Sequence, residues 1–392
     1  MRTHKRPDWA HWRSDPATPD WTIGVEEEVM LLDAATWSLA PVIDELLPSL
    51  SRELAASAAA ETNAATVELA TGVHTRVDDA IAELGSLRER LWLELTTVGL
   101  RAATAGTHPM SEWEDSRVSA GARYQLLEAS LRDLTRREPT FALHLHVGIP
   151  EPELALQVLN RMRVHLPLLL ALSANSPFLR GRETGFASTR TPLFQAFPRV
   201  GLPRLYDCYD EWVHSIAPMI DAGAVPESTF FWWDARLQPR LGTIEIRVMD
   251  VQTSLHETAA LVALARSLVM AEATDRVAAE RLVRAPEVLE ENRFLAARDG
   301  MAAEFVDPRT RNRVPARVLA EEMLECMRLY ATRLGCLDEL LALRQLIENP
   351  PAERQRMLAE DHGVAAIVPA LSQAFCARHG ADATDSETAL AH

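Results

Sequence analysis

Five short stretches of the chain have the composition or the alternation of apolar and polar residues that is typical of β-strands. A strand points successive side chains to opposite faces, so alternation predicts one apolar and one polar face. The last two stretches are joined by a tight segment containing Pro239 and Gly242, which indicates an antiparallel hairpin. The predicted strands are residues 21–32, 65–71, 141–149, 229–237 and 243–251.

Other parts of the chain follow the helical period of 3.6 residues, and a long irregular segment separates two of them. We expect helices over 75–103, after Pro152, over 255–279 and over 315–347. Residues 173–203 are rich in Gly, Pro and Arg, yet they carry several phenylalanines, which is typical of a functional loop rather than of disorder. The sequence therefore predicts a flexible N-terminal arm (1–20), one α+β domain (21–375) and a C-terminal tail (376–392).

The first predicted strand contains three consecutive glutamates. Glu26 and Glu28 share one face, while Glu27 points to the other face with Val25 and Val29. Like charges on one face of a strand repel, so such a run is either a solvated edge or part of a site where a partner stabilises the carboxylates. A divalent cation is one such partner. Glu27 should then be paired by an arginine or exposed.

Polar residues with metal- or phosphate-binding chemistry recur on the other strands. His144 and His146 share a face of 141–149, Glu245 and Arg247 share a face of 243–251, and Glu68 lies opposite apolar neighbours in 65–71. Each strand alone is compatible with an ordinary wet face. Taken together, faces that hold Glu and His in place of Lys, Thr and Ser favour a site for Mg²⁺ or Mn²⁺.

The amino-acid composition excludes or disfavours several classes of function. The net charge of −16 argues against a nucleic-acid or anionic-membrane surface, and no apolar run is long enough to span a bilayer, so we expect a cytoplasmic protein. The single lysine, Lys5, excludes a P-loop, a kinase strand lysine and Schiff-base catalysis. The four cysteines form no CxxC pair, so zinc held by cysteine is not supported. Any bound phosphate must be neutralised by arginines and metal ions.

Eight short motifs occur in order along the chain and together resemble the glutamate–cysteine ligase type 2 family, which comprises carboxylate–amine ligases within the glutamine synthetase-like superfamily. The resemblance covers about residues 21–375. The motifs are GVEEE (24–28), ELATGVH (68–74), GTHP (106–109), HLHVG (144–148), SANSPF (173–178), FQAFPR (194–199), EIRVMD (245–250) and ENRF (291–294).

The resemblance implies a fold like the glutamine synthetase catalytic domain. An antiparallel sheet of about six strands would curve into a funnel with helices outside, and ATP, Mg²⁺ (or Mn²⁺) and a small carboxylate would meet on its concave face. The implied metal ligands are Glu26, Glu28, Glu61, Glu68, His144 and Glu245. The implied catalytic residues are Arg247 and Glu245, of which Arg247 would bind the transferred phosphate or the acyl phosphate. Further candidates for binding substrate or ATP are Arg190, Arg236, His146, Asn292 and Arg293; for Arg190, Arg236 and Arg293 a surface role remains open.

The expected reaction is ATP-dependent amide formation between a small-molecule carboxylate and an amine, of the glutamate–cysteine ligase type. ATP would convert the carboxylate into an acyl phosphate, and the 173–203 segment would close over the site and exclude water. Two alternatives remain: a metal-dependent hydrolase that uses His144 and His146, and a non-catalytic relative that binds nucleotide or metal. No residue specifies the amine, and the apolar helices are compatible with a homodimer without showing one.

Overall fold

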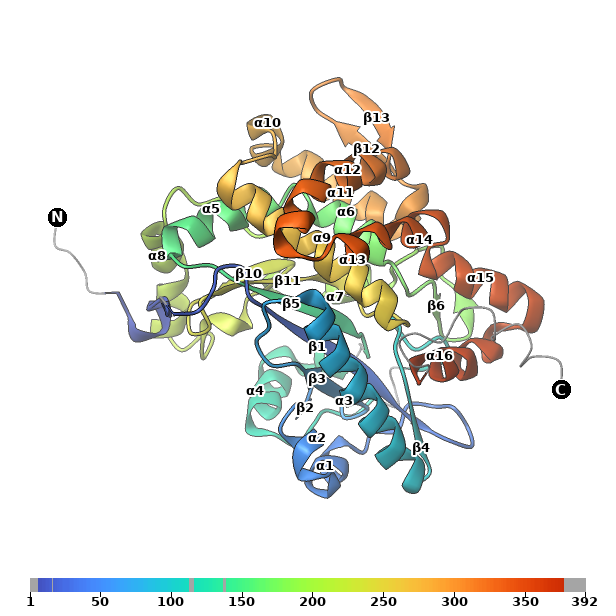
Figure 1. The fold of residues 1–392 in the computed structure, drawn as a ribbon. Coiled ribbons are helices and arrows are strands. Elements are labelled where there is room, and N and C mark those ends of the chain that lie inside the picture. The colour runs from blue at the N-terminus through green and yellow to red at the C-terminus, as the bar shows by residue number, and fades with distance from the viewer. Residues whose placement is uncertain (1–5, 16, 113–115, 137–138, 377–392) are drawn as a thin grey trace.

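The computed structural model describes residues 6–15, 17–112, 116–136 and 139–376, and it is built around one antiparallel sheet (Figure 1). The strand order is β10-β11-β5-β1-β3-β2, and β4 also pairs with β1. The α+β expectation with an antiparallel sheet is confirmed. The strands of this sheet are β1 (Ile23–Asp33), β2 (Ala58–Ala60), β3 (Thr66–Ala70), β4 (Leu100–Ala103), β5 (Ala142–Gly148), β10 (Ala235–Gln238) and β11 (Thr243–Asp250).

Three small two-stranded sheets and a set of helices surround the main sheet. The small sheets pair β6 (Phe178–Leu179) with β7 (Arg182–Glu183), β8 (Val200–Gly201) with β9 (Trp232–Trp233), and β12 (Glu304–Asp307) with β13 (Asn312–Pro315). The α-helices are α1 (Ile43–Leu46), α2 (Arg52–Ala55), α3 (Val77–Thr97), α4 (Ala122–Leu131), α5 (Pro152–Met162), α6 (Leu166–Ser173), α7 (Arg190–Phe194), α8 (Tyr209–Asp221), α9 (Leu255–Thr274), α10 (Glu280–Val283), α11 (Pro286–Asp299), α12 (Ala316–Leu334), α13 (Leu337–Leu341), α14 (Leu343–Glu348), α15 (Pro351–His362) and α16 (Ile367–Phe375).

Helices α3 and α9 cover one face of the main sheet, with α3 against β1 and β3 and α9 against β5 (Figure 1). The middle of α9 is buried all round, which explains why its sequence is apolar with few interruptions. Its N-terminus is fixed by a capping box, in which Ser254 accepts from the Glu257 N–H and the Glu257 carboxylate accepts from the Ser254 N–H. The opposite face of the sheet is therefore free to carry polar side chains.

The structure corrects three of the predicted elements. The helix expected over 75–103 ends at Thr97, and β4 follows. The residues of β4 continue the helical spacing of apolar positions, but they pair with β1 and are therefore extended. The helix expected over 315–347 is broken after Leu334, where Gly335 adopts a left-handed φ of 67° and caps α12. The strand expected over 229–237 is divided into a 3₁₀ turn, β9 and β10.

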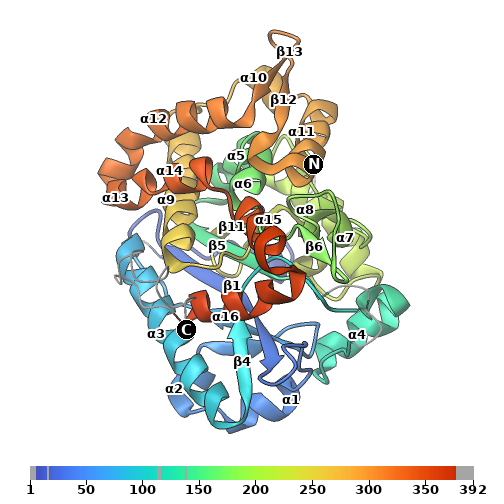
Figure 2. The same ribbon diagram turned by 90° about the vertical axis from the view of Figure 1, so that its right-hand side faces the viewer.

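The described part of the N-terminal segment packs against the body of the protein. The Trp12 indole donates to the Ile149 carbonyl at 2.9 Å, and the Arg13 N–H donates to the Pro239 carbonyl at 2.8 Å. At the other end, α16 packs on β4, where Leu371 belongs to an apolar cluster with β1 (Figure 2). Residues 1–5 and 377–392 of the predicted arm and tail lie outside the described residues. None of the described helices has the length and apolarity that a membrane crossing requires.

Candidate active site

A cavity of about 310 Å³ lies on the polar face of the main sheet. Its walls come from five neighbouring strands (β3, β1, β5, β11 and β10) and from segments that pack over them, including α4, α7 and the turn before β9. One part of the wall is acidic and another is basic. The candidate site residues that line it are Glu26, Glu28, Glu61, Glu68, His144, His146, Arg190, Arg236, Glu245 and Arg247.

The strand register explains why residues far apart in sequence meet in this cavity. Glu28 of β1 lies directly opposite Glu68 of β3, and Glu26 lies opposite His144 of β5. In the same way His146 of β5 lies opposite Glu245 of β11. Directly opposed residues of an antiparallel pair point to the same face, so one polar face is assembled across four neighbouring strands.

Three overlapping groups of side chains place their ligand atoms within 4.8 Å of one another. The groups are Glu26–Glu68–His144, Glu26–His146–Glu245 and Glu28–Glu61–Glu68. Carboxylate oxygens with an imidazole nitrogen are suitable donors for Mg²⁺ or Mn²⁺. All six predicted metal ligands therefore lie in these groups. His146, predicted as a substrate-binding residue, shares the ligand geometry as well.

The acidic part of the cavity concentrates charge that needs a cation. Burial and the neighbouring Glu61 carboxylate raise the pKa of Glu28 to about 8. Burial, followed by the charges of Glu26, Glu61 and Glu28, raises the pKa of Glu68 well above its ordinary value. Burial alone would also raise the pKa of Glu26, but the adjacent imidazoles of His144 and His146 outweigh it and lower that pKa. Like charges forced together in this way are stabilised by a bound cation.

The His144 ring tests whether the residues fit a metal ion. The side chain is buried, and within the described structure neither ring nitrogen has a hydrogen-bond partner. Nδ1 lies 3.4 Å from a Glu26 oxygen and Nε2 lies 3.8 Å from a Glu28 oxygen, without forming hydrogen bonds. Burial and the charge of Arg247 lower the pKa of His144 to about 4, so the ring is neutral at pH 7 and able to ligate. The residues therefore fit a divalent cation.

The basic part of the cavity is built around Glu245, which is 1% exposed. Arg236 donates to its Oε2 at 2.5 Å through Nε and to its Oε1 at 3.1 Å through Nη2, and Gln238 donates to Oε2 at 2.5 Å. Arg247 donates to Oε1 as well. Although burial would raise the pKa of Glu245, the charges of Arg236 and Arg247 lower it. Two guanidinium groups against one carboxylate leave a net positive charge that can face an anion.

The structure brings Arg190 to the same wall but places two other predicted residues elsewhere. Arg190 lines the main cavity and donates to the carbonyls of Arg247 and Val248. Arg293 forms an ion pair with Asp234 and lines a smaller space, which shares the residues Arg190, Phe194, Trp232 and Arg247 with the main cavity. The Asn292 side-chain amide donates to the carbonyl and accepts from the N–H of Val306 in β12, and Asn292 is not among the residues that line the cavity. Its predicted substrate contact has no geometric support.

Sequence reasoning missed several residues of the cavity wall. Gln238 shares the period-two face of Arg236, so strand alternation could have identified it. Arg123 and Tyr124 come from α4, where no pattern marks them. Trp232 reaches the cavity from a two-residue strand that packs against Phe197, with ring centroids 6.1 Å apart. Tyr124 and Trp232 therefore add aromatic side chains to the charged cavity wall.

Glu27 occupies the opposite face of β1, as the alternation predicted. It is fully buried and forms two hydrogen bonds of 2.8 Å with Arg88 of α3. Thr258 of α9 donates to the same carboxylate at 2.9 Å. The prediction that an arginine pairs with Glu27, if it is not exposed, is confirmed. The glutamate between two candidate metal ligands thus ties the sheet to both covering helices.

Comparisons with known proteins agree with this architecture. The model of glutamate–cysteine ligase family 2 matches residues 22–370. Two proteins of Rubrobacter xylanophilus, provisionally named glutamate–cysteine ligases 2-1 and 2-3, are 40% and 36% identical over 88% and 91% of this chain and 91% and 98% of their own. A crystal structure of glutamate–cysteine ligase from Francisella tularensis in complex with AMP superposes with a TM-score of 0.69 at 14% identity, covering 94% of this chain and 91% of that one.

A bifunctional glutathione synthetase from Pasteurella multocida has the same fold over part of its length. Its TM-score is 0.68 at 14% identity, and the match covers 91% of this chain and 52% of that one. Both structural likenesses concern the fold. The family assignment comes from the sequence match, which spans the cavity-lining strands from β1 to β11. The chain therefore belongs to glutamate–cysteine ligase family 2.

Proposed function

We propose that the protein is an ATP-dependent carboxylate–amine ligase that forms an amide through an acyl phosphate. The observation that carries this proposal is the single cavity in which the three acidic groups adjoin Arg190, Arg236 and Arg247. Such an arrangement suits a reaction that brings several negative oxygens together. Family membership supports a ligase, and the AMP complex of the Francisella enzyme supports ATP as the nucleotide.

In the first step a carboxylate oxygen of the donor attacks the γ-phosphorus of ATP, the bond to the β-phosphate oxygen breaks, and ADP leaves. In the second step the amine nitrogen attacks the acyl carbon, phosphate leaves and the nitrogen loses a proton. Glu26, Glu28, Glu61, Glu68 and His144 would hold Mg²⁺ or Mn²⁺, which neutralises phosphate charge when it is bound.

The chain's own basic residues would then orient the anions. Arg247 has a buried Nε with no partner among the described residues, although its Nη1 donates to Glu245. A planar guanidinium with unused donors is suited to bind phosphate oxygens. Phe194 of the 173–203 segment and Trp232 border the same cavity and would limit the access of water that hydrolyses an acyl phosphate.

The geometry favours ligation over the hydrolase alternative. A hydrolytic centre that relies on His144 and His146 would place both imidazoles on one ion with an open position for water. Here His144 and His146 fall into different ligand groups, each dominated by glutamates, and three arginines line the same cavity. The arrangement is that of a site for a highly charged substrate.

A phosphate-release screen tests the proposal. The protein is incubated with ATP, Mg²⁺ and pairs of small carboxylates and amines, glutamate with cysteine included, and the amide is identified by mass spectrometry. We expect phosphate release that requires the carboxylate, the amine and the metal together. Glu26→Gln and Arg247→Ala should abolish it, and Glu53→Gln, an exposed change on α2, is the matched control. Turnover that survives both site substitutions would overturn the assignment.

A further inference from the structure

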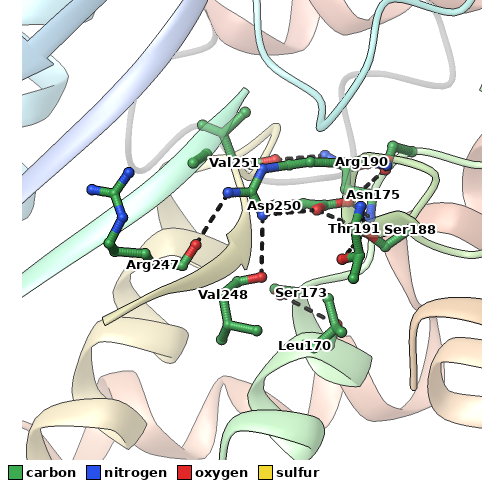
Figure 3. Close-up of polar contacts among 12 residues, drawn as sticks. Leu170, Ser173, Asn175, Ser188, Arg190, Thr191, Arg247, Val248, Asp250 and Val251 are labelled. Atoms are coloured by element: carbon green, nitrogen blue, oxygen red, sulfur yellow. Dashed lines mark hydrogen bonds and ion pairs between the residues drawn. The ribbon is translucent and has the colours of Figure 1, made fainter. Parts of the chain in front are cut away.

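A second polar centre lies next to the active site and is organised by Asp250, the last residue of β11 (Figure 3). The carboxylate is fully buried. Its Oδ2 accepts from the Asn175 N–H at 2.9 Å and from the Ser176 hydroxyl at 2.6 Å, and its Oδ1 accepts from the Ser188 hydroxyl at 2.9 Å. Arg190 provides the nearby positive charge, with Nη1 3.7 Å from Oδ1. One carboxylate thus binds two separate parts of the 173–203 segment.

Three of the sequence motifs that resemble the family meet at this carboxylate. Asp250 ends EIRVMD, and Asn175 and Ser176 belong to SANSPF. Gly106 opens GTHP, and a Cβ at this position would lie 2.5 Å from Asp250 Oδ2 and 2.8 Å from Ser176 Oγ. The site therefore has room for glycine alone at 106, because any side chain would displace the carboxylate or the hydroxyl bonded to it.

The same network determines where Arg190 begins α7. The Arg190 N–H donates to Ser176 Oγ at 3.2 Å, and that hydroxyl donates to Asp250. The guanidinium then donates to the carbonyls of Val248 and Arg247 at 3.2 and 3.1 Å. These two residues lie where the register of β11 with β5 shifts, so a bulge beside the site presents their carbonyls to Arg190.

Arg190 is held at several points but retains an unused donor. It is 6% exposed and lines the cavity, and its Nε has no hydrogen-bond partner in the described structure. A buried donor without a hydrogen-bond partner is costly. Arg190 is therefore fixed in a position that suits an anionic substrate group.

We propose that Asp250 is a positioning residue that sets Arg190 in the wall of the active-site cavity by binding Ser176 and Ser188 on either side of the segment that leads into α7. The substrate contact belongs to Arg190, and Asp250 acts through it. This inference rests on the proposed function for its effect on turnover, although the holding of the segment can be measured without any substrate.

Hydrogen exchange followed by mass spectrometry tests the structural part. In Asp250→Asn the negative charge beside Arg190 is lost, and one of the two acceptor oxygens becomes an NH2 group that cannot accept from the segment, so exchange over 174–194 should rise about tenfold or more. Gly106→Ala should raise exchange in the same peptides. Glu272→Gln is the matched control, since Glu272 is a buried carboxylate that accepts from Arg161 and His165 at 2.6 Å. It should raise exchange around α5 and α9 and leave 174–194 unchanged.

The functional part uses the substrate pair found by the phosphate-release screen. Asp250→Asn should lower kcat/KM by about tenfold or more, and in an Arg190→Ala background the same change should have little further effect. If the losses in kcat/KM of the two single variants multiply in the double variant, the proposal is overturned, because Asp250 would then act independently of Arg190. Unchanged exchange over 174–194 in both Asp250→Asn and Gly106→Ala would also overturn it. If no pair is turned over, the proposed function fails, while the exchange result still decides whether Asp250 holds the segment.

Discussion

The buried ion pair between Glu27 and Arg88 provides the sharpest test of how the site is supported. Glu27 is 0% exposed and Arg88 is 2% exposed. Besides its two bonds to Glu27, Arg88 donates to the carbonyls of Thr253 and Gln252 at 2.9 and 3.0 Å. Its guanidinium also lies 4.8 Å from the ring centroid of Phe375 in α16. One side chain therefore links α3, β1, the start of α9 and the C-terminal helix.

Arg88→Met would leave the Glu27 carboxylate buried with Thr258 as its remaining donor. Removing one partner of a buried pair typically costs about 3–5 kcal/mol, because the other charge stays desolvated and unpaired. That is a large part of the roughly 5–15 kcal/mol by which a folded protein is usually stable. Glu27→Leu should cost a similar amount, whereas Glu27→Leu/Arg88→Met should cost less than the sum of the two by at least about 2 kcal/mol.

Urea unfolding monitored by tryptophan fluorescence measures these differences, provided that each variant unfolds in one transition. The control is the exposed pair of Glu53 and Arg90, which also involves α3 and has side chains that are 72% and 47% exposed. Substituting either member of that pair should change stability by less than about 1 kcal/mol. An Arg88→Met cost as small as that of Arg90→Met, or strictly additive losses, would show that Glu27 and Arg88 do not depend on each other in the folded protein. Where the variants stay folded, Glu27→Gln should retain more turnover than Glu26→Gln, since its side chain points away from the cavity.

Three further predictions concern the metal site and the C-terminal helix. Burial and Glu61 raise the pKa of Glu28 to about 8, and burial with the neighbouring glutamates raises the pKa of Glu68, so Mg²⁺ binding should release protons at pH 7 and tighten as pH rises toward 8. Calorimetry in buffers of different ionisation enthalpy measures this, and zero proton release at pH 7 would contradict it. His144→Asn should weaken Mn²⁺ binding more than Mg²⁺ binding, because imidazole suits the softer ion, and equal losses in titrations would speak against a ligand role. Phe375→Leu should lower stability by about 2 kcal/mol through the lost contact with Arg88, and an unchanged urea midpoint would exclude that contact.

Local sequence alone is enough to predict which side chains share the polar face of the sheet. Period two separates Glu26 and Glu28 from Glu27, and it places His144 with His146 and Glu245 with Arg247. These assignments depend on local geometry alone, since a strand fixes the face of every side chain once its backbone is extended. The ordered motifs also indicated the family, which the sequence comparisons show.

Strand register and long-range packing fix how these faces meet and which polar residues reach the cavity. The pairing of Glu28 with Glu68 and of Glu26 with His144 follows from register between strands that are far apart in the chain. The role of Asp250 depends on contacts with residues 62 to 75 positions away, which no local period encodes. Asn292 was predicted to bind substrate because it lies in the ENRF motif beside Arg293. Its side chain instead forms hydrogen bonds with the backbone of β12, which the local sequence does not indicate. Local periodicity fixes the direction of a side chain, whereas long-range packing and hydrogen bonding fix its neighbours.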